Sequence, residues 1–340
     1  MSDNINNSTA AAPESKSEYL LEVKDLTTHF YLEKATVYAV NDLNFSLKPG
    51  ETIGIVGETG AGKTTTALSI MGLVQSPPGI IASGEIIFEG QDLLKLPESQ
   101  MRKIRGNRVT MIFQDPMTSL NPTMSVQSQI AEVLNLHQNL TATEANTKAL
   151  EMLDKVGIRS DRAKDYPHQF SGGMRQRVGI AIALACNPAL LISDEPTTAL
   201  DVTIQAQVLE LMKQLKEELD TSMIMITHDL GIVAEICDKV AIMYAGSVVE
   251  SADVNELFES PKHPYTIGLF NSLPDIEKDV EKLKPIKGLM PDPTNLPSGC
   301  PFHPRCDSVK PECSQKAPKR VEIAPGHFVK CLLFEGSGRA

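Results

Sequence analysis

Alternating apolar and polar residues predict the first strands of the chain. LLEVKDLTTHF (20–30) and AVNDLNFSL (39–47) place apolar residues at about every second position, as in strands with one face in water. ETIGIVG (51–57) is instead a continuous apolar run that ends in glycine, which is typical of a buried parallel strand. A helix over 64–74 and a further strand over 85–90 follow.

Strands and helices alternate through the middle of the chain. RVTMIFQDP (108–116) predicts a strand that stops at Asp115-Pro116, and 126–156 predicts a helical stretch. The apolar stripe of that stretch consists of Ile130, Val133, Leu134, Leu150, Leu153 and Val156. Further strands are predicted at 189–196, 221–229 and 239–246, with helices at 201–220 and 231–237 between them. This order implies an α/β fold with a parallel sheet and crossover helices.

The amino-acid composition changes near Glu250, beyond which proline becomes frequent. We therefore expect one large domain over 19–250 and a separate extension over 251–340, which together suit a chain of 340 residues. Residues 1–18 are polar, with no basic start and no apolar stretch, so we expect a disordered tail rather than a signal peptide.

The net charge and the hydropathy of the chain limit which kinds of binding partner we expect. The net charge of −11 argues against a protein that wraps nucleic acid. The longest apolar run is Val178–Cys186, far below the ~20 residues that span a bilayer. We therefore expect a cytosolic protein whose membrane role, if it has one, depends on partners.

GETGAGKT (57–64) has the spacing of a phosphate-binding loop and lies between a predicted strand and a predicted helix. Small residues let the backbone amides surround phosphate oxygens. Lys63 would hold the β- and γ-phosphates, and the Thr64 hydroxyl would ligate Mg²⁺. The residues assigned to ATP in this loop are Gly57, Glu58, Thr59, Gly60, Ala61, Gly62, Lys63, Thr64 and Thr65. A chance glycine turn is the alternative, and the strand–helix context disfavours it.

Polar side chains follow three other predicted strands. Asp194 and Glu195 end an apolar strand, where Asp194 can hold Mg²⁺, directly or through water, and Glu195 can act as general base toward the γ-phosphate. A salt-bridging acidic pair is the alternative. His228 ends the strand 221–229 and could reach the γ-phosphate. Gln114 stands at a similar strand end and could contact Mg²⁺ or the attacking water.

A second anion site is predicted at FSGGMRQR (170–177), where Ser171, Gly172 and Gly173 open an apolar helix. The nucleotide already has its loop at 57–64, so these amides are better placed to bind the γ-phosphate of a nucleotide held by another subunit. Two chains facing head to tail would then enclose two ATP molecules. An ordinary Ser-Gly-Gly helix cap is the alternative.

Taken together, these motifs resemble the ATP-binding subunit of an ABC transporter over 19–250. The family's ordered motifs are the phosphate loop, Q-loop Gln114, signature SGGMRQ at 171–176, LLISDE at 190–195, D-loop Ala199-Leu200-Asp201 and switch His228. The signature departs from the commonest form, with Phe170 in place of leucine and Met174-Arg175 before Gln176. Because the serine and both glycines are present, we expect a working site.

The resemblance implies a P-loop ATPase with a RecA-like core, an antiparallel β subdomain and a helical subdomain at about 116–180. It also implies that Gln176 and Asp201 join Ser171, Gly172 and Gly173 at the partner's nucleotide. An aromatic residue of the family stacks on adenine. Phe30 is the candidate here, with Tyr31 and Tyr38 as rivals.

HPYTIGLFNSLP (263–274) and SGCPFHPRC (298–306) resemble the C-terminal extension of the oligopeptide and dipeptide permease ATPases. That branch also includes nickel importers. The resemblance implies an ATP-hydrolysing subunit at the cytoplasmic face of the membrane that powers peptide uptake. It implies a second ATPase, expected to be a paralogue, two integral membrane subunits and an extracytoplasmic binding protein. A nickel importer, a soluble ABC ATPase of DNA repair or translation, and an iron–sulfur module with a degenerate nucleotide site are the alternatives.

The extension concentrates four of the chain's six cysteines, Cys300, Cys306, Cys313 and Cys331. Their spacing matches neither the usual zinc-finger pair nor the common ferredoxin runs. Disulfides are disfavoured in a reducing cytosol, and a metal centre would explain how a proline-rich segment folds. Resemblance to cluster-bearing relatives favours [4Fe–4S] over Zn²⁺. In a zinc site His303 or His327 could replace a cysteine. Cys186 and Cys237, in contrast, are expected to pack in the core.

Overall fold

Two sheets and a set of helices make up the computed structural model, which describes residues 18–115, 119–198, 200–272 and 285–336. The tail predicted at 1–18 lies outside the described residues except for Glu18. The larger sheet has the strand order β11-β12-β10-β9-β3-β8-β7-β6. Its central strands are β3 (Thr52–Val56), β6 (Val109–Ile112), β7 (Leu190–Asp194), β8 (Ser222–Thr227) and β9 (Lys239–Tyr244). All neighbouring pairs among these strands are parallel, which confirms the predicted parallel sheet for the centre of the molecule.

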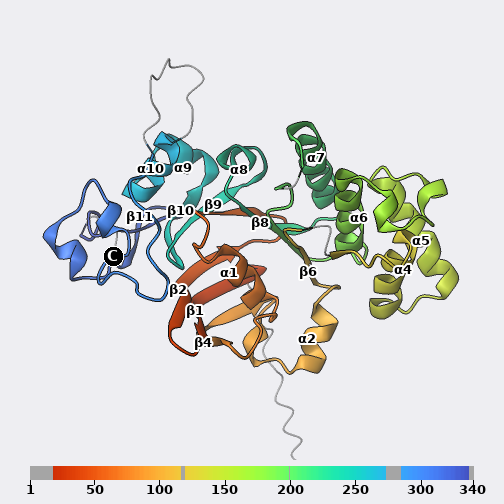
Figure 1. Cartoon of the computed structure of the whole chain (residues 1–340), viewed down its shortest axis with the longest axis horizontal. Coiled ribbons are helices and arrows are strands. Elements are labelled where there is room, and N and C mark those ends of the chain that lie inside the picture. Colours follow the sequence, from red (N-terminus) through yellow and green to blue (C-terminus); the bar gives the residue numbers. More distant parts are fainter. Residues whose placement is uncertain (1–17, 116–118, 199, 273–284, 337–340) are drawn as a thin grey trace, which may run out of the picture.

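The smaller sheet is antiparallel, with the order β2-β1-β4-β5. Its strands are β1 (Leu21–Tyr31), β2 (Thr36–Leu47), β4 (Gly79–Phe88) and β5 (Gln91–Asp92). With α1 (Lys63–Ile70) it lies on one side of the larger sheet (Figure 1), and Leu21, Leu43 and Ile86 share a buried core with Ile53 and Ile224 of that sheet. The short elements η1 (Leu93–Lys95) and α2 (Glu98–Ile104) follow β5. Burial of its apolar face therefore fixes this sheet beside the loop that precedes α1.

The helical part stands at the end of the molecule opposite the C-terminal segment (Figure 1). It contains α4 (Val126–His137), α5 (Ala142–Lys155) and α6 (Gly172–Leu184), with the short helices η2 (Ser160–Arg162) and η3 (Pro167–Gln169). The stretch predicted for 126–156 is helical but consists of two helices, because the chain turns at Gln138. Thr141 and Glu144 then start α5 with a capping box, each side chain accepting from the other residue's backbone amide.

Four helices cover the side of the larger sheet opposite α1, namely α7 (Val202–Glu218), α8 (Leu230–Ile236), α9 (Val254–Glu259) and α10 (Pro264–Asn271) (Figure 1). Their apolar side chains, such as Leu215, Val233 and Leu257, join Met223 and Val240 of the sheet in one buried core. Cys186 and Cys237 are buried, as expected. Among the described residues, no helix has both the length and the apolar composition that crossing a bilayer requires.

The C-terminal extension continues the larger sheet instead of standing apart from it. Strand β12 (His327–Lys330) pairs antiparallel with β10 (Ser247–Asp253), and β11 (Arg320–Ala324) pairs with β12. The short helices η4 (His303–Arg305) and η5 (Pro311–Ser314) precede this hairpin. The change in composition near Glu250 is therefore no break in the sheet.

A buried ion pair fixes the hairpin to the sheet. The Nε2 of His327 lies 2.8 Å from a carboxylate oxygen of Glu250, and its Nδ1 lies 2.9 Å from Glu256. The side chains of His327 and Glu250 have no exposed surface. The alternative that His327 ligates zinc is wrong, because both ring nitrogens already contact carboxylates.

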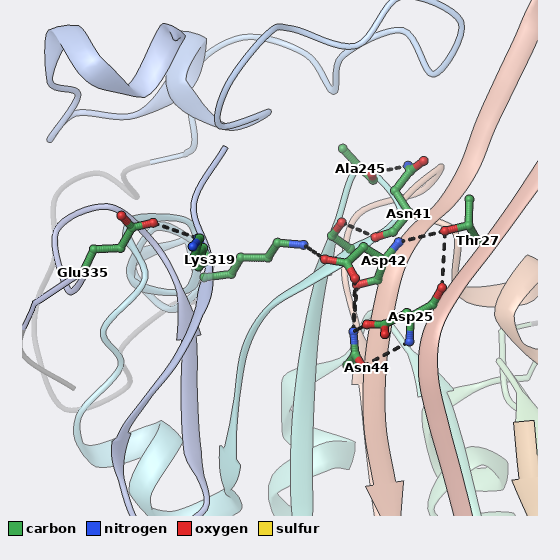
Figure 2. A network of polar contacts seen from close by, with 10 residues as sticks. Asp25, Thr27, Asn41, Asp42, Asn44, Ala245, Lys319 and Glu335 are labelled. Atoms are coloured by element: carbon green, nitrogen blue, oxygen red, sulfur yellow. Dashed lines mark hydrogen bonds and ion pairs between the residues drawn. The ribbon is translucent and has the colours of Figure 1, made fainter. Parts of the chain in front are cut away.

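Polar contacts join the extension and both sheets. Lys330 of β12 forms a 2.8 Å ion pair with Asp42 of β2. Figure 2 shows Asp42 in a network in which the Nδ2 of Asn44 donates to Asp25, at 3.0 Å, and that of Asn41 to the carbonyl of Ala245, at 3.1 Å. The smaller sheet is thus held from the side of the extension as well as from the core.

Candidate functional site

The loop between β3 and α1 has the backbone of a phosphate-binding loop. A Cβ added at Gly57 would lie 2.3 Å from the carbonyl oxygen of Met243, and one at Gly62, where φ is +99°, would lie 2.3 Å from that of Ala39. Both positions therefore require glycine. The close packing of this loop against β9 and β2 fixes the direction of its amides at the N-terminus of α1.

Lys63 and Asp194 lie buried at the inner side of this loop. The Nζ of Lys63 donates to the carbonyls of Gly57, at 2.7 Å, and Glu58, at 3.3 Å, and burial lowers its pKa. Burial raises the pKa of Asp194, although a hydrogen bond from Thr64 opposes the rise. The predicted phosphate ligand and the predicted Mg²⁺ ligands are thus brought together.

The residues fit a bound Mg²⁺. Asp194 is 2% exposed, and its Oδ1 makes no hydrogen bond to any part of the chain that the structure describes. Such a buried carboxylate oxygen beside the Thr64 hydroxyl offers the oxygen ligands that Mg²⁺ prefers. A bound ion would satisfy the Oδ1 of Asp194, which otherwise has no hydrogen-bond partner among the described residues.

The predicted catalytic residues converge on Glu195. Its carboxylate accepts hydrogen bonds from Gln114 Nε2 at 3.1 Å and Thr198 Oγ1 at 3.0 Å. The Nδ1 of His228 lies 3.5 Å from the same carboxylate, and the Nζ of Lys63 lies 3.9 Å from it. Glu195 also adopts a left-handed backbone, with φ at +46°, which costs a non-glycine residue of the order of 1 kcal/mol. Strain of this kind is typical of functional positions.

These side chains line one open cavity of about 600 Å³. Its lining consists of Phe30, Val37, Ala39, Thr59, Gly60, Ala61, Gly62, Lys63, Thr64, Thr65, Gln114, Glu195, Thr198, His228 and Pro293. Of the three aromatic candidates for adenine, Phe30 lines the cavity, whereas the lining does not include Tyr31 and Tyr38. The cavity joins an apolar wall from β1 and β2 to the polar loop, a shape that suits a nucleotide.

The second glycine motif lies elsewhere. Ser171 is exposed and caps α6 by accepting from the amide of Met174 at 3.4 Å, and Gly172 is exposed beside it. Asp201 is exposed and caps α7. Gln176 is buried, 1% exposed, in a separate small cavity with Met111 and Phe113. None of the described residues of 171–176 lines the nucleotide cavity, and Ala199 of the D-loop lies outside the described residues.

Comparisons with known proteins agree with this geometry. A family model described as "ABC transporter" matches residues 40–198, and one described as "Oligopeptide/dipeptide transporter, C-terminal region" matches residues 249–313. The oligopeptide transport ATP-binding protein AppD of Bacillus subtilis is 53% identical over 321 residues, covering 94% of this chain and 98% of AppD. OppD of Escherichia coli is 50% identical over 330 residues, covering 96% and 97%. The chain belongs to the oligopeptide/dipeptide branch of the ABC transporter ATP-binding subunits.

Solved structures of this ABC ATPase fold superpose on the chain. The dimeric ATP-binding cassette MJ0796 bound to ADP and phosphate is 28% identical with a TM-score of 0.61, covering 69% of this chain and 98% of that one. CbiO1 of Clostridium perfringens is 28% identical with a TM-score of 0.62, covering 74% and 96%. The resemblance inferred from the motifs is therefore confirmed, and the chain is an ABC ATPase subunit.

Several residues of the ABC site were not foreseen from the sequence, among them Thr198, Pro293 and Arg305. Thr198 follows the Asp-Glu pair closely enough that its proximity could have suggested the contact to Glu195. Pro293 and Arg305 come from the extension, and Arg305 holds the carboxylate of Glu58 in the phosphate loop at 3.0 Å. No local pattern marks either residue, because the partners lie far away in sequence.

The four cysteines of the extension are gathered in one region. Cys313 and Cys331 are buried, and Cys300 and Cys306 are partly buried. Burial, together with the three neighbouring cysteines, raises the pKa of Cys331 to about 11. In type and number these donors fit [4Fe–4S] or Zn²⁺. Within the described ranges, however, no three His, Cys, Asp or Glu side chains are grouped so that they could hold a metal ion, so metal binding stays a prediction.

Proposed function

We propose that this subunit hydrolyses ATP to power the uptake of dipeptides or oligopeptides through membrane partners. The observation that carries the proposal is the convergence of Gln114, His228 and Lys63 on Glu195 beside the phosphate loop. The match of residues 249–313 to the oligopeptide/dipeptide transporter region supports the choice of cargo. AppD and OppD carry oligopeptide transport in their names.

The chemistry follows from the placement of each group. Lys63, released from the loop carbonyls, contacts the β- and γ-phosphates, and Glu195 accepts the proton of the attacking water. Gln114 and His228 hold the Glu195 carboxylate and the water in line with the γ-phosphate. Thr64, Asp194 and Gln114 are the proposed holders of Mg²⁺, which when bound supplies positive charge against the phosphate oxygens.

The working unit is a dimer in which each nucleotide is enclosed by two chains. Ser171, Gly172 and Gly173 present the exposed N-terminus of α6, a position that favours an anion and that is separate from the cavity of its own chain. Gln176 and Asp201 act with this motif, Asp201 from the exposed start of α7 and Gln176 from the buried face of α6. We propose a paralogous ATPase as the second chain.

The membrane partners bind beside Gln114. The neighbouring Phe113 is 43% exposed and lines, with Leu120 and Gln176, a cavity of about 130 Å³ between β6 and α6. An apolar side chain from a membrane subunit suits this cavity. Two integral membrane subunits, an extracytoplasmic binding protein and a position at the cytoplasmic face of the membrane complete the proposed importer, which has no nucleic-acid partner.

Reconstitution with the membrane subunits tests this function. We expect steady ATP turnover that rises when these subunits and their binding protein are present, together with uptake of peptides within a defined length range. Uptake of Ni²⁺ in place of peptides would support a nickel importer. A rate of ATP turnover that does not change when the membrane subunits are added would support a soluble ABC ATPase.

We also propose that Cys300, Cys306, Cys313 and Cys331 bind a [4Fe–4S] cluster with a structural role, zinc being the alternative. Iron, sulfide and zinc analysis of the purified chain separates the two. Serine at any of the four positions is expected to lower the iron content. Serine at the buried Cys186 or Cys237 is the matched control and is expected to leave the iron content unchanged. A colourless protein with zinc and no iron would reverse the choice of metal.

A further inference from the structure

The C-terminal extension contributes to the nucleotide cavity itself. Pro293 lines the cavity together with Phe30, Val37 and Ala39. The polar part of the lining, from Thr59 to Thr65, belongs to the phosphate loop. A nucleotide with its phosphates on that loop therefore extends its base toward the apolar wall, which includes a side chain from the extension.

Hydrogen bonds fix the position of Pro293. The amide of Tyr38 on β2 donates to the carbonyl of Pro293 at 2.9 Å. Asp292 accepts from the amide of Thr294, at 2.8 Å, and from its hydroxyl, at 2.7 Å. Met290 packs against both apolar cores of the molecule. The proline ring is thus held against the cavity by backbone contacts that do not depend on its own side chain.

The extension also holds the phosphate loop. The guanidinium of Arg305 donates to both carboxylate oxygens of Glu58, at 3.0 and 3.3 Å, and its side chain is 6% exposed. The same guanidinium reaches the hydroxyl of Tyr244 at 3.4 Å, and its Nε donates to the carbonyl of Lys287 at 2.9 Å. The amide of Glu58 donates to the hydroxyl of Tyr265 at 3.1 Å. Glu58 is therefore fixed through both its side chain and its backbone.

We propose that the extension is part of the ATP site, with Pro293 contacting the nucleobase and Arg305 positioning the phosphate loop through Glu58. The proposal rests on ATP binding at the site described above. Adenine offers a flat apolar face that a proline ring can cover, whereas the triphosphate needs loop amides in fixed directions. The two residues therefore affect different parts of the same ligand.

Two probes, ATP and inorganic triphosphate, separate the two roles in the full-length chain. Pro293→Ala keeps the carbonyl that Tyr38 contacts and removes most of the ring. We expect its Kd for ATP to rise about three- to tenfold and its Kd for inorganic triphosphate to stay unchanged. Pro325→Ala, at an exposed proline of the extension that does not line the cavity, is the matched control. Unchanged ATP affinity, or equal losses for both probes, would overturn the role of Pro293.

Arg305→Gln and Glu58→Gln test the positioning of the loop. We expect each variant to raise the Kd for ATP and for inorganic triphosphate by the same factor, about five- to tenfold. The double variant should be no weaker than either single variant, because both remove one contact. Arg320→Gln, at an arginine of the extension that stacks on Phe328, is the control.

Glu58→Gln keeps the test decisive if Arg305→Gln does not fold, since it removes the contact from the side of the loop. Additive losses in the double variant, or unchanged triphosphate affinity in Glu58→Gln, would overturn the role of Arg305. If the wild-type chain bound neither probe, the proposed ATPase function would fail instead.

Discussion

The side-chain amide of Gln114 donates a hydrogen bond to the carboxylate of Glu195 at 3.1 Å. The two residues follow β6 and β7, which pair in parallel with Ile112 opposite Ser193, so their side chains emerge at the same edge of the sheet. Gln114 also directly follows Phe113, which lines the small cavity between β6 and α6. A partner that moves the segment after β6 would therefore act directly on the carboxylate proposed as the catalytic base.

Glu195→Gln should keep ATP binding and lose at least about a hundredfold in turnover. The amide is nearly isosteric with the carboxylate but does not accept the proton of the attacking water. Phosphate release and nucleotide binding, measured on the same preparation, check both parts. Glu235→Gln, on the exposed side of α8, serves as control. Near-normal hydrolysis in Glu195→Gln would contradict the assignment of the base.

Ser171→Arg should leave the ATP affinity of its own chain almost intact and abolish hydrolysis at the facing site. The bulky side chain obstructs the exposed start of α6, which is separate from the cavity of the same chain. Loss of the helix cap alone costs about 1 kcal/mol of stability. Thr141→Arg removes another cap, at the start of α5, and controls for that cost. Loss of ATP binding in cis would rule out the proposed split site.

His263 should make the chain sensitive to mild acid. Its Nδ1 accepts from the amide of Tyr265 at 3.0 Å, and burial lowers its pKa to about 4. Because the unfolded pKa is about 6.5, this stabilisation is present above pH 6.5 and is lost as the pH falls toward 4. His263→Asn keeps an acceptor and does not titrate.

The comparison of wild type with His263→Asn isolates this effect. Glu250, whose carboxylate accepts from the amide of His263 at 2.8 Å, and His327 also have shifted pKa values, but both titrate in both proteins. As the pH falls from 6.5 to 5, the free energy of unfolding of the wild type should decrease by about 2 kcal/mol relative to that of His263→Asn. Thermal unfolding at both pH values measures it. A difference that does not change with pH would contradict the buried, neutral histidine.

His327→Leu should loosen the hairpin of β11 and β12 from the main sheet. The change leaves the fully buried Glu250 without its charged partner, and breaking such a pair costs about 3–5 kcal/mol. Faster hydrogen exchange at the amides of β12, together with a lower thermal midpoint, is the expected result. Glu256→Gln alters the partner that is 37% exposed and should cost less than about 1 kcal/mol. Equal losses of stability in the two variants would show that the buried pair of His327 and Glu250 stabilises the fold no more than the exposed contact with Glu256.

The sequence predicted the parts of the fold that depend on local patterns. Continuous apolar runs predicted β3, β7 and β8, and the glycine spacing of 57–64 predicted the loop in which close contacts exclude a Cβ at Gly57 and Gly62. The polar residues after three strands were each assigned to the γ-phosphate, its attacking water or Mg²⁺, and parallel strands bring their ends to one edge of the sheet. In each case neighbouring residues carry enough information to define the structure.

Contacts between distant segments could not be predicted in this way. Arg305 and Glu58 are 247 residues apart, and neither lies in a periodic pattern that points to the other. The pairing of β12 with β10 depends on the buried contact of His327 with Glu250, two polar residues that a hydropathy pattern assigns to the surface. The turn after Gln138 was missed because residues 137–141 contain neither glycine nor proline to mark the end of α4.

The hairpin of the extension also determines which strand forms the edge of the main sheet. Without it, β10, which carries Val248 and Val249, would be a bare edge open to pairing with another chain. With it, the outermost strand is the short β11, whose exposed Arg320 and Glu322 discourage strand addition. We therefore expect the extension to protect the ATPase from aggregation, so that a chain cut after residue 253 is poorly soluble.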